Sequence, residues 1–184
     1  MSEHEKDIEM TECDGPNYEE ALKRIRDHSE AHKNDANTMS VSTYFEGLQK
    51  FCNDGWAYGE GYNASKKTID CAYYPYEARG KQGAHGCTTE YNSDLIDKGP
   101  IANLGGYDGL VPGMEVFQGT TGTKEHMGVY CGKKTLDGKL QHAVYQSCSS
   151  HNTIDFMYPE PSGPNITGMN KKWLFWGWSK YVTQ

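Results

Sequence analysis

The spacing of the apolar residues changes near the middle of the chain, and this change limits the folds open to it. Between residues 43 and 52, apolar residues recur at helical spacing, as at Phe45, Leu48 and Phe51. From Pro112 onward, short segments alternate between apolar and polar residues, as strands do. Helices followed by strands favour an α+β fold, in which N-terminal helices pack on an antiparallel sheet of about five to six strands.

Cap and turn residues set the expected bounds of the helices. Thr43-Tyr44-Phe45-Glu46 has the form of a capping box, which predicts a first helix from Thr43 to Asn53. Asp70 is a favoured N-cap, so a second helix is expected from Cys71 to Arg79, with a kink or a 3₁₀ start at Pro75. A third helix is expected over residues 88–97.

The second half is expected to consist of strands and turns. The expected strands are Met114–Gln118, His126–Cys131, Leu140–Tyr145, Thr153–Tyr158 and Trp173–Tyr181. A loop over residues 159–168 is expected before the last strand.

The first 38 residues differ from the rest, because they are acidic and weakly apolar. Residues 20–28 predict a short charged helix with a narrow apolar stripe. This helix either docks on the domain or on a partner, or it forms a solvated extension, and its narrow stripe favours the solvated extension. The predicted organisation is therefore a tail over residues 1–38 and a globular domain over residues 39–184.

Composition and charge exclude several classes of function. The 184 residues carry 18 Lys and Arg against 25 Asp and Glu, for a net charge of −7. An acidic chain without clustered basic residues is not expected to bind nucleic acid. No apolar run approaches the roughly 18–20 residues of a membrane span, and no apolar signal segment follows Met1. We expect a monomer without a metal or other cofactor.

The cysteines give the first candidate for chemistry. They are Cys13, Cys52, Cys71, Cys87, Cys131 and Cys148. Without a secretion signal, most are expected to be reduced, small apolar residues. Cys71 differs because it would lie in the first turn of a helix, where free N–H groups and the helix dipole stabilise a thiolate and an oxyanion. The alternative is that Cys71 is a buried structural cysteine.

Two histidines complete a possible catalytic group, since a thiolate needs a base and the base needs an orienting partner. His126 begins one expected strand and His142 lies in the next. If the hairpin is centred near Lys134, the two histidines face each other at about 5 Å. A two-residue turn at Asp137-Gly138 would prevent this pairing. We therefore expect a longer loop across residues 132–139.

Four short segments resemble a known family when they are taken together. In chain order they are Ile69-Asp70-Cys71-Ala72, Leu110–Phe117, His126–Gly132 and Gln141-His142-Ala143. They resemble the NlpC-type cell-wall peptidases, a bacterial and phage branch of the papain-like cysteine peptidases. That family has an Asp-Cys-Ser-Gly helix start, a Pro-Gly-Asp-Leu-Val-Phe strand and a His-Val-Gly-Ile-Tyr strand. The resemblance covers about residues 40–181 and includes a glycine-rich loop at residues 56–61.

The resemblance implies a role for each matching residue. Cys71 would be the nucleophile, His126 the general base and His142 the residue that orients it. The Cys71 N–H and Tyr58 would stabilise the oxyanion. The substrate would be a bacterial peptidoglycan stem peptide.

The resemblance also implies which residues contact the substrate. In such enzymes the loop tyrosine and the aspartate before the cysteine hold the free amine of the substrate, and Tyr58 and Asp70 match these positions. Trp56 and Tyr73 would add aromatic contact. Ala72 and Tyr73 replace the family's Ser and Gly, and these departures concern substrate preference.

Other functions fit parts of the sequence. A CHAP-like amidase or an acyltransferase on a related scaffold would use a similar Cys and His pair. A non-catalytic module that binds cell walls or belongs to a phage tail would use the aromatic residues alone. A zinc site is the third alternative, formed by His85, Cys87, Cys148 and His151.

The absence of a signal segment predicts synthesis in the cytoplasm. Action on a cell wall would then follow release as a phage lysin, as a phage tail component or by a non-classical export route.

Overall fold

The computed structural model describes residues 15–148, 151–156 and 172–184. Its centre is a six-stranded sheet in the order β5-β10-β6-β7-β8-β9, in which every neighbouring pair is antiparallel. The strands are β5 (Leu95–Pro100), β6 (Glu115–Gly119), β7 (Lys124–Leu136), β8 (Lys139–Cys148), β9 (His151–Phe156) and β10 (Phe175–Ser179). The predicted α+β fold and the predicted size of the sheet are confirmed.

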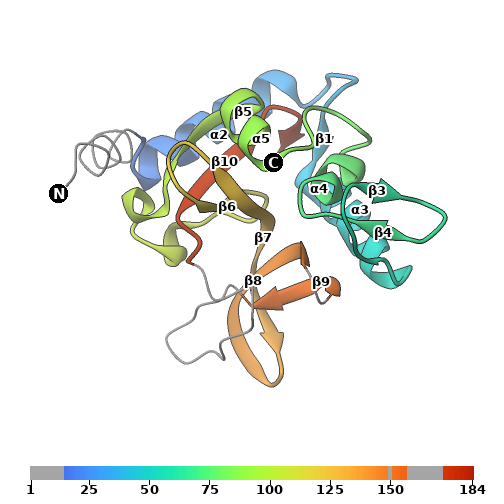
Figure 1. The fold of residues 1–184 in the computed structure, drawn as a ribbon. Coiled ribbons are helices and arrows are strands. Elements are labelled where there is room, and N and C mark those ends of the chain that lie inside the picture. Colours follow the sequence, from blue (N-terminus) through green and yellow to red (C-terminus); the bar gives the residue numbers. More distant parts are fainter. Residues whose placement is uncertain (1–14, 149–150, 157–171) are drawn as a thin grey trace.

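Helices and small sheets lie around this sheet, at the top and right of Figure 1. The helices are α2 (Tyr18–His32), α3 (Val41–Asn53), α4 (Tyr73–Ala78) and α5 (Cys87–Ser93), with 3₁₀ turns η1 (Ile101–Leu104) and η2 (Tyr107–Gly109). The small strands are β1 (Met39–Ser40), which pairs with β11 (Val182–Thr183), and β2 (Ala57–Tyr58), β3 (Tyr62–Asn63) and β4 (Thr68–Ile69). Within the described ranges, no helix has the length and apolar character that crossing a membrane requires.

The chain from α3 to α4 follows the predicted order with shifted bounds. The α3 helix begins at Val41 because the Ser40 side chain accepts the N–H of Thr43 at 3.1 Å, so the capping box placed its start too late. The α4 helix begins at Tyr73, and Pro75 lies in its first turn, where a missing N–H costs no helical hydrogen bond. Cys71 therefore lies in the turn before α4 and not in the helix.

The third predicted helix, over residues 88–97, is correct in its first half and wrong in its second half. The α5 helix ends at Ser93, and residues 95–100 form the edge strand β5. Pairing with β10 overrides the local helical preference there. A Cβ atom at Gly177 of β10 would collide with the Leu95 side chain, so the two strands pack closely.

The hairpin between β7 and β8 is longer and tighter than predicted. Asp137 and Gly138 form a two-residue turn with φ values of 50° and 78°, and Leu136 pairs with Lys139. The predicted loop over residues 132–139 is therefore wrong. So is the predicted pairing of His126 with His142, because His142 lies opposite Lys133.

The N-terminal helix belongs to the core. Ala21 and Ile25 of α2 are fully buried in the main apolar cluster. Arg24 donates to Asp97 at 3.1 Å, and the N–H of Gln184 donates to Ser29 Oγ at 2.9 Å. Of the alternatives for this segment, the structure shows the helix docked on the domain.

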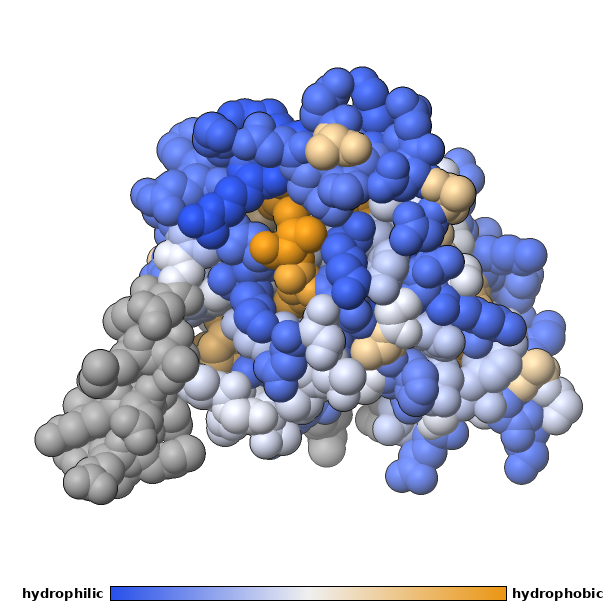
Figure 2. All heavy atoms as spheres, turned by 90° about the horizontal axis from the view of Figure 1, so that it is seen from above, coloured by the Kyte–Doolittle hydropathy of each residue, from blue (hydrophilic) through white to orange (hydrophobic). Residues whose placement is uncertain are grey.

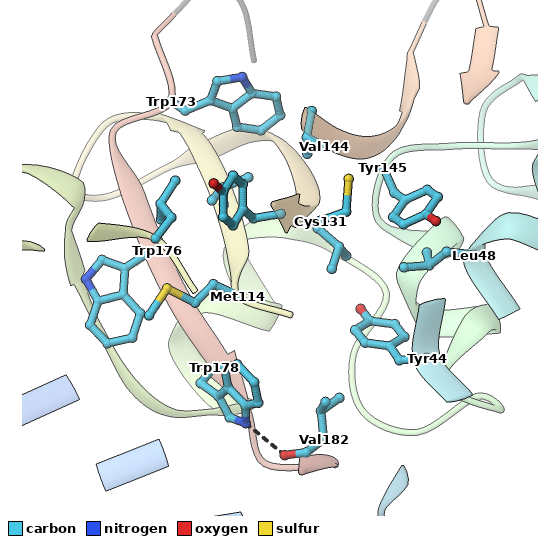
Figure 3. Packing of buried hydrophobic residues seen from close by; sticks show 14 of the residues in the cluster. Tyr44, Leu48, Met114, Cys131, Val144, Tyr145, Trp173, Trp176, Trp178 and Val182 are labelled. Atoms are coloured by element: carbon cyan, nitrogen blue, oxygen red, sulfur yellow. Dashed lines mark hydrogen bonds between the residues drawn. The ribbon is translucent and has the colours of Figure 1, made fainter. Parts of the chain in front are cut away.

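Most of the apolar side chains point between the helices and the sheet. Figure 3 shows Tyr44 and Leu48 of α3 in one cluster with Met114 and with Trp176 and Trp178 of β10. The face seen in Figure 2 is mostly hydrophilic, with a small hydrophobic area near its centre. This core fixes the sheet against α3 and α4, and the candidate site lies at that junction.

Candidate active site

Cys71 is held between a small sheet and the central sheet. It lies two residues after the end of β4, where the carbonyl of Ile69 accepts the hydroxyl of Ser147 in β8 at 2.7 Å. The carboxylate of Asp70 then shapes the turn, because Oδ1 accepts the N–H groups of Ala72 and Tyr73 at 3.0 and 2.7 Å. These bonds fix the backbone on both sides of the thiol.

His126 of β7 lies beside Cys71, and its side chain is fixed on its far side. Its Nε2 lies 2.9 Å from Oε1 of Gln146 in β8, which leaves Nδ1 for the thiol. The ring of Trp173 lies 5.4 Å from the imidazole. Gly128 permits this packing, since a Cβ atom there would lie 2.8 Å from the Tyr145 carbonyl and 3.3 Å from the Trp173 ring.

The surroundings of Cys71 favour its charged form. A hydrogen bond from the Cys87 thiol lowers the pKa of Cys71. Burial raises this pKa, whereas the hydrogen bond and the charge of His126 lower it further. The net result is a pKa of about 5. Burial alone would lower the pKa of His126, but the hydrogen bond and charge of Cys71 and the bond to Gln146 raise it. Near neutral pH, these contacts therefore favour a Cys71 thiolate, and the thiolate and His126 each stabilise the charged form of the other.

Cys87 contributes a second thiol, in contact with that of Cys71. It is the first residue of α5, and its Sγ lies 3.5 Å from Sγ of Cys71. The hydrogen bond to Cys71 and burial raise the pKa of Cys87 well above its usual range, so Cys87 keeps its proton and donates it. The sequence predicts a small apolar residue or a zinc ligand at Cys87, since nothing local to it indicates its distance from Cys71.

His142 is not part of this group. Its Nδ1 lies 2.8 Å from the hydroxyl of Tyr130, and its Nε2 lies 3.1 Å from Oδ1 of Asp108. Burial lowers the pKa of His142. Because β7 and β8 pair as far as the turn at residues 137–138, His142 lies opposite Lys133, close to the turn. Gln146, four residues further along β8, lies beside His126 instead.

Sequence reasoning missed Gln146 because its position depends on the strand register. Val129 pairs with Tyr145, so Gln146 lies diagonal to His126 on the same face of β7 and β8. Predicting a two-residue turn at Asp137-Gly138 from the sequence would have indicated this register.

Tyr58 lies near the thiol, as predicted. Strand β2 pairs in parallel with β4, with Tyr58 opposite Ile69. Burial first, and then the negative charges of Cys71 and Asp70, raise the pKa of Tyr58. Its hydroxyl therefore stays protonated and able to donate a hydrogen bond beside the nucleophile.

Trp56 and Tyr73 belong to a chain of aromatic rings next to the nucleophile turn. Trp56 stacks on Tyr62 with ring centroids 5.4 Å apart, and Tyr62 lies 6.2 Å from Tyr73. Tyr73 in turn stacks on His85 at 4.4 Å. Tyr62 is 40% exposed, so this row of rings, called the aromatic row below, is open to solvent at Tyr62.

The residues of the considered zinc site do not form a metal cluster in the described part of the chain. There, no group of three or more His, Cys, Asp or Glu side chains is arranged to hold a metal ion. His85 stacks on Tyr73, Cys87 contacts Cys71, and the side chain of His151 lies outside the described part.

Comparison with known proteins gives a likeness in fold only. No protein-family model and no curated protein matches the chain. Among solved structures, the chain is similar to a protein described as similar to lipoprotein, of the NLP/P60 family, from Staphylococcus aureus subsp. aureus Mu50. The TM-score is 0.44 at 13% identity, and the match covers 69% of this chain and 41% of that one. The chain thus spans less than half the length of that protein.

Proposed function

We propose that this chain is a cysteine-dependent amide hydrolase that cuts peptides of the bacterial cell wall. One observation carries the proposal: the thiol of Cys71, the imidazole of His126 and the amide of Gln146 lie in series. This is the order of nucleophile, base and orienting group that acyl transfer requires. Gln146 takes the orienting role that the sequence assigned to His142.

The chemistry follows from the charge states of the pair. The Cys71 thiolate attacks the carbonyl carbon of the scissile amide, and the His126 imidazolium gives its proton to the leaving amine. An acyl-enzyme remains on the sulfur. The neutral His126 then takes a proton from water, which attacks the acyl carbon and releases the product. Gln146 keeps the ring of His126 in place through both steps.

The oxyanion would be held by donors beside Cys71. The N–H groups of Ala72 and Tyr73 are bound to Asp70, so they are not available to it. The expected donors are the Cys71 N–H and the hydroxyl of Tyr58, which burial and nearby negative charge keep protonated.

The proposed substrate class rests on the residues around the thiol and on the motifs described above. Asp70 places a carboxylate next to the nucleophile, where it suits a substrate with a free amine. The aromatic row offers flat surfaces for a peptide or a sugar ring. Asp70 also holds the turn, so its substitution is expected to disturb the position of Cys71 as well as binding.

Mass spectrometry of purified peptidoglycan tests the proposal. Walls of several chemotypes are digested with the wild type and with Cys71→Ala, and the soluble fragments are compared. New fragments from the wild type alone are expected, and their masses name the bond. A cut between sugar and peptide would indicate an amidase in place of an endopeptidase. No fragments from any wall, or equal release by Cys71→Ala, would contradict the proposal.

A further inference from the structure

The proposed hydrolysis needs Cys71, His126 and Gln146, but it does not need a second thiol. Cys87 nevertheless lies with its sulfur 3.5 Å from that of Cys71, and both side chains are partly buried. The two residues are 16 positions apart, with Cys71 in the turn before α4 and Cys87 at the start of α5. Their contact is therefore made by the tertiary fold.

Several contacts hold Cys87 against the nucleophile turn. The buried Arg79 at the end of α4 donates to the carbonyls of Gln82 and Ala84, at 3.1 and 3.2 Å, in the loop before α5. His85 in the same loop stacks on Tyr73, two residues after Cys71. These contacts bind the loop that leads to Cys87 across the start of α4.

Two other described cysteines, Cys52 and Cys131, do not share this arrangement. Burial raises the pKa of Cys131 to about 12. Burial also raises the pKa of Cys52, which lies 3.2 Å from the hydroxyl of Tyr74. Cys71 has the lowered pKa of a reactive thiolate, and Cys87 is a protonated thiol in contact with it. Oxidants are therefore expected to react at Cys71 before these two thiols.

We propose that Cys71 and Cys87 are a redox pair, in which a hydroperoxide oxidises Cys71 and Cys87 resolves the product to a reversible disulfide. The pair would switch off the nucleophile of the proposed hydrolase and protect it from irreversible oxidation. The regulatory meaning rests on the proposed function, whereas formation of the disulfide does not.

The two steps balance with hydrogen peroxide as the oxidant. The Cys71 thiolate attacks one peroxide oxygen, an S–O bond forms, the O–O bond breaks, and the released hydroxide takes up a proton as water. The Cys87 sulfur, after losing its proton to solvent, attacks the Cys71 sulfur. The S–S bond forms, the S–O bond breaks, and the second hydroxide is protonated. Two thiols thus lose two electrons and two protons, and one peroxide becomes two waters.

The geometry requires a small movement only. A disulfide has an S–S bond of about 2.05 Å, so the sulfurs must approach by about 1.5 Å. Cys71 lies in a turn outside α4, and Cys87 is the first residue of α5. Neither residue is inside a long helix that would resist such a shift.

Peptide mapping of the full-length protein tests the pair directly. Trypsin places Cys71 in the peptide 68–79 and Cys87 in the peptide 82–98, each with no other cysteine. After treatment with hydrogen peroxide near neutral pH, these two peptides are expected to be linked, and dithiothreitol is expected to separate them. Linkage of Cys71 to any other cysteine, Cys13 included, would overturn the proposal. So would direct oxidation of Cys71 to the sulfinic acid in the wild type.

A matched pair of variants tests the resolving role. In Cys87→Ser, Cys71 is expected to be trapped by dimedone as the sulfenic acid and then to reach the sulfinic acid, which dithiothreitol does not reverse. Cys52→Ser is the control and is expected to form the linkage as the wild type does. Equal protection of Cys71 in Cys87→Ser and the wild type would overturn the proposal. Because the linkage is mapped without an activity assay, a protein that forms it but digests no wall would refute only the proposed function.

Discussion

Gln146 orients His126 through its side-chain oxygen, which lies 2.9 Å from Nε2 of the imidazole. The bond joins neighbouring strands β7 and β8 and directs the other ring nitrogen toward Cys71. It also contributes to raising the pKa of His126. The position of the His126 ring is therefore set by a buried amide and not by a second histidine.

This relationship predicts different effects for two substitutions on β8. Gln146→Ala is expected to lower kcat/KM by about 10- to 100-fold, since a hydrogen bond to a charged partner contributes about 1.5–3 kcal/mol. His142→Ala is expected to leave kcat/KM within about twofold, because its partners are Tyr130 and Asp108. Both are measured on a soluble fragment that the wild type cleaves.

The pH profile separates orientation from a general loss of structure. Loss of the Gln146 bond lowers the pKa of His126, so the alkaline limb of kcat/KM in Gln146→Ala is expected at lower pH than in the wild type. Gln146→Asn is expected to restore part of the rate. An unshifted limb, or a larger loss in His142→Ala, would assign the orienting role elsewhere.

The thiol of Cys71 is expected to react at unusually low pH. Its pKa is lowered to about 5, first by Cys87 and then by His126. The rate of alkylation by iodoacetamide should therefore rise with pH through a midpoint near this value and then level off. Cys71→Ala gives the background from the other thiols. A midpoint near the ordinary value of a cysteine would show that Cys71 is a neutral thiol near pH 7.

Cys87 is the largest cause of this lowered pKa, which predicts a second shift. Cys87→Ala removes the donor, so the alkylation midpoint of Cys71 should rise by about one unit or more, since one unit corresponds to about 1.4 kcal/mol. Cys87→Ser keeps a donor and should shift the midpoint less. A lower midpoint in Cys87→Ala would contradict the donating role of Cys87.

The sequence predicted the architecture better than the contacts, for physical reasons. The spacing of apolar residues is local, so the general order of helices and strands followed from it. The expectation that Cys71 lies in the first turn of a helix was wrong, because α4 begins two residues later. The partner of His126 depended on strand register, which a two-residue turn at Asp137-Gly138 changed. Cys87 approaches Cys71 only through tertiary contacts such as those of Arg79, which leave no local pattern in the sequence.

The docked α2 helix predicts that the N-terminal segment stabilises the whole domain. Ile25 is fully buried, so Ile25→Ala is expected to lower the free energy of unfolding by about 2–5 kcal/mol. Arg26 is exposed on the same helix, and Arg26→Ala is expected to change the free energy of unfolding by less than about 0.5 kcal/mol. Urea denaturation followed by tryptophan fluorescence measures both. Equal stability of Ile25→Ala and the wild type would mean that α2 is not part of the cooperative unit.

A buried charge group beneath the site predicts opposite effects for two similar substitutions. The Arg79 guanidinium donates to Glu115 at 2.7 Å and to Glu90 at 3.0 Å. Burial, together with the charge of Glu115, raises the pKa of Glu90 to about 11, so near pH 7 Glu90 is protonated and Glu115 balances the arginine. Glu115→Gln would leave Arg79 buried without that charge and is expected to destabilise the fold by about 3–5 kcal/mol.

Glu90→Gln replaces a neutral acid with a neutral amide and is expected to retain or raise stability at pH 8. The folded wild type holds one proton more than the unfolded chain between the ordinary pKa of Glu90 and about 11, so its stability falls as pH rises in that window. This one proton lowers the free energy of unfolding by up to about 1.4 kcal/mol for each unit that the pH rises, and Glu90→Gln is expected to remove this dependence on pH. Urea denaturation at pH 6 and pH 8 compares the slopes. If Glu90→Gln loses as much stability as Glu115→Gln at both values, Glu90 is charged in the fold and the assignment of the proton is wrong.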